Sequence, residues 1–181
     1  MKYISLFLLA ALTLAHTAAA REPIVLDRIV DDWTPVVQYS TARHLPIVLL
    51  VTSAECGYCE LLKKDVLRPM QRSGALEEQA IVREMHLDAG GKIVDFDGEK
   101  VRARLFLRRY EVFATPTLLF LDKDGRPLHE PLVGFNGRDN YLPLLTSALT
   151  QSRAALEQFN DETRKLAGDS SGLGLSRAAA N

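Results

Sequence analysis

The chain has 181 residues, of which 47% are hydrophobic and 25% are charged, and its formal net charge is −1. This composition is that of one globular domain, and the balanced charge excludes a strongly basic nucleic-acid binder and an acidic disordered protein. There are only two cysteines, Cys56 and Cys59, which excludes the disulfide framework of small secreted domains and leaves one potential site.

The first twenty residues predict an export signal. Lys2 gives a positive start, an apolar run follows from Ile4 to Ala15, and Ala18 to Ala20 supply the small side chains of a cleavage site. The apolar run is shorter than the about 20 residues that a membrane-spanning helix needs, so a cleaved secretory signal is favoured over a membrane anchor. We expect a mature chain that begins at Arg21, has no membrane span and resides in the periplasm, an oxidising compartment.

The first half of the mature chain predicts a helix, a strand and a second helix. Residues 21–30 have mixed character and predict no element, whereas residues 31–43 favour a helix that Asp31 or Asp32 can cap. Ile47 to Thr52 is an unbroken apolar and β-branched run, typical of a strand buried on both faces. In the next helix, apolar residues recur every three or four positions, and Pro69 should end or kink it.

The second half continues the alternation. The expected elements are a strand over 80–87, a loop or small hairpin over 88–98, a helix over 99–110, strands over 117–121 and 128–135, and one or two helices from 140 to about 166. Residues 168–181 are rich in Gly, Ser and Ala without periodicity, and we expect them to be disordered. The predicted organisation is therefore a signal peptide (1–20), one α/β domain (21–167) and a tail (168–181).

Cys56-Gly57-Tyr58-Cys59 lies directly after the buried strand, at the start of a predicted helix. Unpaired N–H groups and the positive end of the helix dipole stabilise a thiolate at that position. Cys56, at the helix end, is predicted to attack a substrate disulfide, and Cys59, one turn inside, to resolve the mixed disulfide. Lys63, Lys64 and Arg68 of the same helix are expected on a solvated face.

Two cysteines at this spacing can also serve in three other kinds of site. A structural zinc site needs four ligands, and the mature chain adds only histidines that lack finger spacing, namely His44, His86 and His129. A c-type haem site needs His after the second cysteine, where this chain has Glu60. An inert disulfide is the remaining alternative, although closing so short a loop removes little entropy from the unfolded chain.

The strand, the CxxC and the helix, together with Tyr110 to Thr117, resemble the thioredoxin fold over about residues 32–149. The resemblance implies a central mixed sheet of four or five strands with helices on both faces. It implies that Pro116 is a cis proline facing the cysteines, so that the backbone of Thr115 can pair with a substrate strand. Gly57-Tyr58 with Thr115 is similar to periplasmic disulfide isomerases and reductases of the Dsb type, and the surrounding residues also resemble small exported thioredoxins, including those of sulfur-oxidation systems.

The chain departs from that family at two points. Thioredoxins carry a buried Asp six residues before the first cysteine, where it helps to move the proton of the second, and this chain has Leu50 there. Glu55, Glu60 or water are the candidates to replace it. Dimeric isomerases also carry an N-terminal dimerisation domain, for which residues 21–30 are too short, so a monomer is expected.

The predicted function is thiol–disulfide exchange on protein or small-molecule disulfides, catalysed by Cys56 and Cys59. Gly57, Tyr58, Thr115 and Pro116 are the expected substrate contacts. We expect a reductase kept reduced by a membrane thiol–disulfide electron donor, without cofactor, metal or nucleic acid. Two alternatives stay open: a non-catalytic binding module with a fixed disulfide, and the dedicated redox partner of a sulfur-oxidation or cytochrome-maturation system.

Overall fold

The structure is a computed structural model that describes the backbone of residues 25–175 and the side chains of residues 30–166. The predicted signal peptide and the new N-terminus at Arg21 lie outside the described residues. In chain order the elements are β1 (Val25–Ile29), α1 (Thr34–Arg43), β2 (Ile47–Thr52), α2 (Gly57–Leu62), η1 (Lys63–Leu67), α3 (Arg68–Arg72), β3 (Ile81–His86), β4 (Lys92–Val94), β5 (Lys100–Arg102), α4 (Ala103–Arg108), β6 (Thr117–Leu121), β7 (Pro127–Val133) and α5 (Arg138–Leu175).

Five strands form one mixed sheet in the order β1-β3-β2-β6-β7. The central strand β2 is parallel to β3 and antiparallel to β6, and the outer strands β1 and β7 are parallel to β3 and antiparallel to β6, respectively. Every residue of β2 is buried, which confirms the expected strand with both faces covered. The chain leaves β2 at Thr52, so the turn that carries the cysteines starts at the centre of the sheet.

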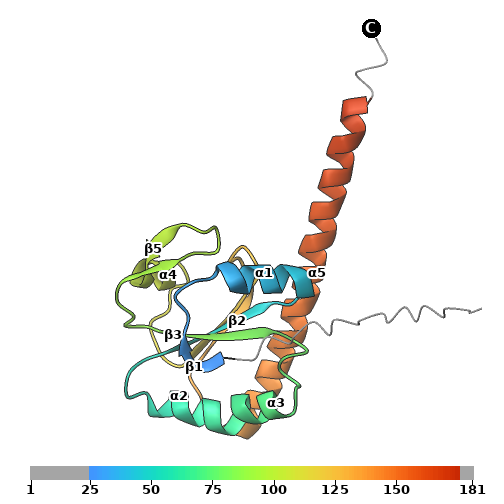
Figure 1. The fold of residues 1–181 in the computed structure, drawn as a ribbon. Coiled ribbons are helices and arrows are strands. Elements are labelled where there is room, and N and C mark those ends of the chain that lie inside the picture. The colour runs from blue at the N-terminus through green and yellow to red at the C-terminus, as the bar shows by residue number, and fades with distance from the viewer. Residues whose placement is uncertain (1–24, 176–181) are drawn as a thin grey trace, which may run out of the picture.

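Helices cover both faces of the sheet. Figure 1 shows α1 and α4 on one side and α2 and α3 on the other. Val48 and Leu50 of β2 pack in an apolar cluster with α2, η1 and α5. Ile47, Leu49 and Val51 pack in a second cluster with α1 and α4. Successive strand residues point to opposite faces, so β2 contributes to both clusters and fixes the start of α2 relative to the sheet.

Strand β1 lies in the segment for which the sequence predicted no element. Asp27 and Arg28 interrupt its apolar residues, so no period of two is visible. The strand forms along the edge of β3, with Val25 opposite Arg83 and an irregular register toward Ile29. This pairing joins segments that are distant in the sequence, which a local pattern does not reveal.

The Gly- and Asp-rich segment after β3 forms a hairpin, one of its two expected forms. Its strands β4 and β5 are antiparallel, with Ile93 opposite Val101. The expected helix from Glu99 is therefore wrong at its start, because β5 occupies residues 100–102 and α4 begins at Ala103. Val101 fits a helical period in the sequence, but in the structure it lies in β5 and packs against the apolar cluster that includes Ile93.

Pro69 does not end the helix that carries the cysteines. The helix α2 passes into one π-helical turn, η1, and then into α3, which ends at Arg72. Within this turn the N–H of Arg68 donates to the carbonyl of Lys63, five residues back. The wider turn changes the hydrogen-bond register just before Pro69, which accommodates the missing N–H and the bulk of the proline ring.

The last helix, α5, is longer than expected. Its first half packs on the sheet through Leu145, Leu149 and Leu156, and Figure 1 shows its far end extending beyond the rest of the domain. The expected disordered tail is helical as far as Leu175, and residues 176–181 lie outside the described part. Once nucleated, a helix gains one hydrogen bond for each residue added, so it can continue without an apolar period.

Candidate active site at the Cys56–Cys59 disulfide

Cys56 and Cys59 form a disulfide at the start of α2, and their Cα atoms are 5.2 Å apart. A short turn connects the end of β2 to this disulfide, and Glu55 in it has a φ of 60°. Residues other than glycine adopt this left-handed conformation at a cost. The turn places Cys56 at the N-cap of α2, as the sequence predicted.

The first turn of α2 directs its amide groups toward Cys56. The N–H of Cys59 is 3.2 Å from the Sγ of Cys56, and the carbonyl of Cys56 accepts hydrogen bonds from the N–H groups of Cys59 and Glu60. An N-cap side chain that accepts from the first turn satisfies a donor that would otherwise lack a partner. After reduction, the same N–H and the helix dipole favour the thiolate of Cys56.

The two sulfurs differ in exposure. Cys59 is only 1% exposed, whereas Cys56 is half-buried and borders the exposed residues Glu55 and Gly57. A substrate disulfide can therefore reach Cys56 more readily than Cys59. This asymmetry is consistent with Cys56 as the attacking and Cys59 as the resolving cysteine.

Thr115 contacts Cys56 directly. The peptide bond between Thr115 and Pro116 is cis, as the resemblance implied, and the hydroxyl of Thr115 donates to the Sγ of Cys56 over 3.5 Å. The Oγ of Ser53 lies 2.9 Å from the Oγ1 of Thr115. A hydroxyl has a single hydrogen, so Ser53 donates to Thr115 while Thr115 donates to the sulfur. Ser53 was missed by the sequence reasoning, although its place in the turn before the motif was a usable signal.

The remaining predicted contacts lie on the surface of the site. Gly57 is exposed, and a Cβ added there would have nothing within 4 Å. Tyr58 is 64% exposed and Phe113, near the cis proline, is 85% exposed. A pocket of about 200 Å³ lies beside this loop, with Phe113, Ala114 and Val133 among its lining residues. Apolar side chains are thus available to a bound polypeptide next to the cis proline.

A thioredoxin-like domain family matches residues 36–149. The chain belongs to this family. The match, together with the mixed sheet and the helices on both of its faces, confirms the expected thioredoxin fold. The matched segment, residues 36–149, contains both cysteines and the cis proline. A comparison with curated proteins finds no significant match.

Solved structures with this fold are similar at low sequence identity. The periplasmic thioredoxin SoxS from Paracoccus pantotrophus is 19% identical, with a TM-score of 0.41, over 59% of this chain and 98% of that one. The C-terminal domain of DsbD from Neisseria meningitidis is 17% identical, with a TM-score of 0.48, over 67% of this chain and 99% of that one. A DsbH oxidoreductase is 18% identical, with a TM-score of 0.46, over 74% of this chain and 92% of that one.

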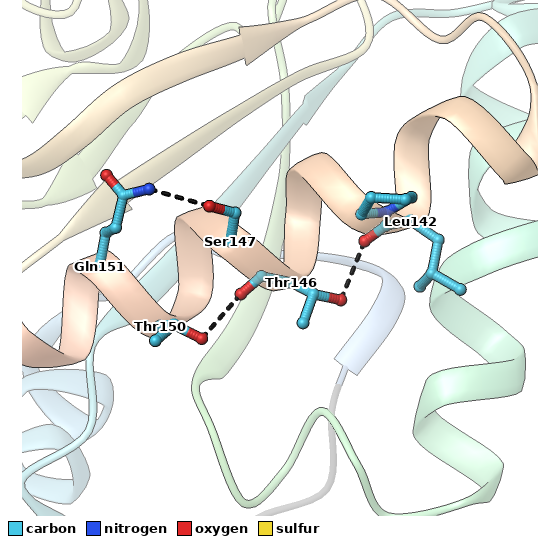
Figure 2. A pocket seen from close by; sticks show the side chains of 6 residues that line it. Leu142, Thr146, Ser147, Thr150 and Gln151 are labelled. Atoms are coloured by element: carbon cyan, nitrogen blue, oxygen red, sulfur yellow. Dashed lines mark hydrogen bonds between the residues drawn. The ribbon is translucent and has the colours of Figure 1, made fainter.

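Another surface pocket lies on the outer side of α5 and holds no comparable chemistry. Figure 2 shows its lining, which comes from Leu142 to Gln151 of that one helix. The hydroxyls of Thr146 and Thr150 donate to carbonyls one turn earlier, and Gln151 donates to Ser147. These polar groups satisfy one another within the helix, so the disulfide is the better candidate for a reactive site.

The described part of the chain shows neither a cluster of metal-ligating side chains nor a helix that could span a membrane. Among the side chains that the structure describes, those of residues 30–166, no three His, Cys, Asp or Glu groups gather as they would to hold a metal ion. None of the described helices combines the length and the hydropathy that crossing a bilayer requires.

Charged side chains lie buried beneath the cysteines, and the sequence did not predict them. Lys63 was expected on a solvated face, but it is only 4% exposed, and Glu84 of β3 is only 1% exposed. The Nζ of Lys63 lies 3.3 Å from the Oε1 of Glu84, which also accepts from the hydroxyl of Thr52 over 2.9 Å. Lys63 follows Cys59 by one helical turn, so the stripe that buries the cysteine buries the lysine too.

The position of the family's buried acid is apolar, as the sequence indicated. Leu50 is fully buried and lies opposite Glu84 in the β2–β3 register. Of the candidates to replace that acid, Glu55 is exposed. The side chain of Glu60 is 62% exposed, and its Oε1 lies 2.7 Å from the Nζ of Lys63. The residue opposite the missing acid on the neighbouring strand thus carries a buried carboxylate.

Proposed function

We propose that the mature chain catalyses thiol–disulfide exchange through Cys56 and Cys59 and acts as a reductase of protein or small-molecule disulfides. The observation that carries the proposal is the disulfide at the N-terminus of α2, with one accessible and one buried sulfur and a threonine hydroxyl on the accessible one. A thioredoxin-like fold with a CxxC pair supports this class of reaction.

The reaction has two exchange steps. The Cys56 thiolate attacks one sulfur of the substrate disulfide, whose S–S bond breaks, and the other substrate sulfur leaves as a thiolate. The Cys59 thiolate then attacks the Sγ of Cys56, re-forms the intramolecular disulfide and releases the first substrate sulfur. Two electrons pass to the substrate, and a dithiol donor must restore them. The exposed Tyr58 and the backbone of Thr115 would hold the substrate strand.

The proposed setting is the periplasm, with a membrane thiol–disulfide protein as the electron donor and the mature chain as a monomer. The predicted signal at residues 1–20 and the redox chemistry of that compartment support it. Dsb-type reduction and a dedicated role in sulfur oxidation or cytochrome maturation use the same exchange steps, so both are versions of this proposal.

The activity test measures the reduction of insulin disulfides by dithiothreitol with and without the purified mature chain. We expect acceleration, because a thiolate at a helix N-terminus is already activated. The variant with both cysteines replaced by serine is the matched control. If the reduced wild type gives no acceleration, or if its reduction potential lies below about −300 mV, the pair is a structural disulfide and the binding module is correct.

The roles of the two cysteines are tested by trapping. Cys59→Ser should capture partner proteins as mixed disulfides that disappear on adding reductant, because the accessible Cys56 is left without its resolving thiol. Cys56→Ser should capture almost none, because Cys59 is only 1% exposed. Non-reducing gels of periplasmic extracts at equal expression make the comparison. Equal trapping, or stronger trapping by Cys56→Ser, would show that the roles are assigned wrongly.

A further inference from the structure

A buried ion pair lies beneath the disulfide and needs a physical reason. Lys63 is 4% and Glu84 is 1% exposed, and their Nζ and Oε1 atoms are 3.3 Å apart. Removing two charges from water costs several kcal/mol for each ion, and well-packed apolar residues are often at least as stabilising. Stability alone is therefore a weak reason for this pair, and its place in the fold is more informative.

The pair lies between the helix of Cys59 and the central strand. The N–H of Lys63 donates to the carbonyl of Cys59, so the two side chains are one turn apart on the same helix face, where neighbours interact. Glu84 lies opposite Leu50 in the β2–β3 register. Leu50 packs in the apolar cluster that also contains Leu62 of α2. The side chain of Glu84 consequently points toward α2 and η1, where Lys63 meets it.

Lys63 also marks a change in the helix. The α-helical turns end at Leu62, and the π-helical turn η1 begins at Lys63. Single π-turns inside helices occur frequently at functional sites. At this point the irregular turn carries a buried ammonium group one turn from a buried thiol.

We propose that Lys63 and Glu84 set how readily Cys59 loses its proton during the second exchange step. This inference rests on the proposed function. When Cys56 is held in the mixed disulfide, the thiol of Cys59 gives its proton to water, and its thiolate attacks the Sγ of Cys56. The S–S bond to the substrate breaks, and the departing substrate thiolate takes a proton from water. The Lys63 charge favours the Cys59 thiolate, and the Glu84 charge opposes it while holding the ammonium in place. Both are positioning residues.

Other ionisable groups face this region. On the helix itself Glu60 contacts Lys63, and Lys64 is exposed to solvent. From β3 comes His86, which lies opposite Thr52, and from α5 comes the buried Tyr141 of the same apolar cluster. Burial raises the pKa of Tyr141, so it stays neutral across the range in which thiols titrate. The effect of Lys63 and Glu84 on the pKa of the Cys59 thiol is therefore measured by changing one charged side chain at a time.

The experiment titrates Cys59 by thiolate absorbance in reduced Cys56→Ser protein, which requires no enzymatic activity. Lys63→Met should move the Cys59 midpoint upward by about one pH unit, a tenfold fall in thiolate fraction, because it removes a positive charge one helical turn from the thiol. Glu84→Gln should move it downward by a similar amount. Lys63→Arg, which keeps the charge, should restore the midpoint, and Lys64→Met on the exposed face should not change it.

Removing one member of a buried pair can destabilise a protein strongly, so circular dichroism checks each variant. If Lys63→Met or Glu84→Gln does not fold, Glu60→Gln gives the answer, because removing the negative charge of this exposed side chain should lower the Cys59 midpoint by a smaller amount. Shifts in the same direction for Lys63→Met and Glu84→Gln, or midpoints unchanged in every variant, would overturn the proposal. An inactive wild type with the expected shifts would overturn only the proposed function.

Discussion

The hydroxyl of Thr115 is the group whose removal should change Cys56 most directly. It donates to the Sγ of Cys56 over 3.5 Å and lies 2.9 Å from the Oγ of Ser53. A hydrogen bond to a charged group contributes about 1.5–3 kcal/mol. The sulfur contact is long, so the lower end, about 1.5 kcal/mol, applies, and this corresponds to about one pKa unit. Thr115→Val should therefore raise the pKa of the Cys56 thiol by about that amount.

Because the pKa of the Cys56 thiol is raised in Thr115→Val, the loss of thiolate depends on pH. Below both pKa values the variant has about one tenth of the wild-type thiolate, and above the raised pKa the difference disappears. The assay is the rate of iodoacetamide alkylation against pH in a reduced Cys59→Ser background. Thr115→Ser retains the hydroxyl and should titrate like the parent. Thr146→Val removes an exposed hydroxyl that bonds only within α5 and serves as the matched control. Coincident profiles for Thr115→Val and its parent would refute the reasoning.

Two further predictions concern Gly125, in the turn after β6, and Tyr110, whose hydroxyl donates to the carbonyl of Gly125. Gly125 has a φ of +76°, and a Cβ added there would lie 2.5 Å from the Phe96 ring and 2.9 Å from the Tyr110 hydroxyl. Gly74 has the same φ, but a Cβ added there would have nothing within 4 Å. Gly125→Ala should therefore cost about 2–4 kcal/mol in urea unfolding against about 1 kcal/mol for Gly74→Ala, and equal losses would contradict the close contact. Burial raises the pKa of Tyr110 from 10.0 to about 12, so the folded state retains a proton that the unfolded chain has lost, and stability should fall between these pH values. Tyr110→Phe should reduce that fall in urea titrations at alkaline pH, and an undiminished fall would show that another group causes it.

The central part of the fold could be predicted because its signal is local. Ile47 to Thr52 is a strand with the predicted bounds, since a continuous apolar run of that length fits the middle of a covered sheet. The start of α2 at the cysteine pair followed from the motif and its place after that strand. The cis peptide at Pro116 followed from the family resemblance and not from any periodicity.

Two of the misses, β1 and the burial of Lys63, depend on partners far along the chain, and a third, β5, depends on the adjacent strand of its hairpin. Strand β1 exists through its pairing with β3, and β5 exists through β4 rather than through its own composition. Lys63 fits a solvated helix face when its neighbours alone are considered. It is buried because Glu84, from another strand, compensates its charge.

The end of β2 connects the two sulfurs to different polar groups. Thr52 and Ser53 are consecutive, and successive residues of an extended chain point in opposite directions. Thr52 donates to Glu84, the partner of Lys63 beneath Cys59. Ser53 contacts Thr115, the donor to Cys56. The attacking and the resolving cysteine therefore have separate polar environments that begin at neighbouring residues. Substitutions on one side should change one sulfur and leave the other unchanged, so the two titrations described above are independent tests.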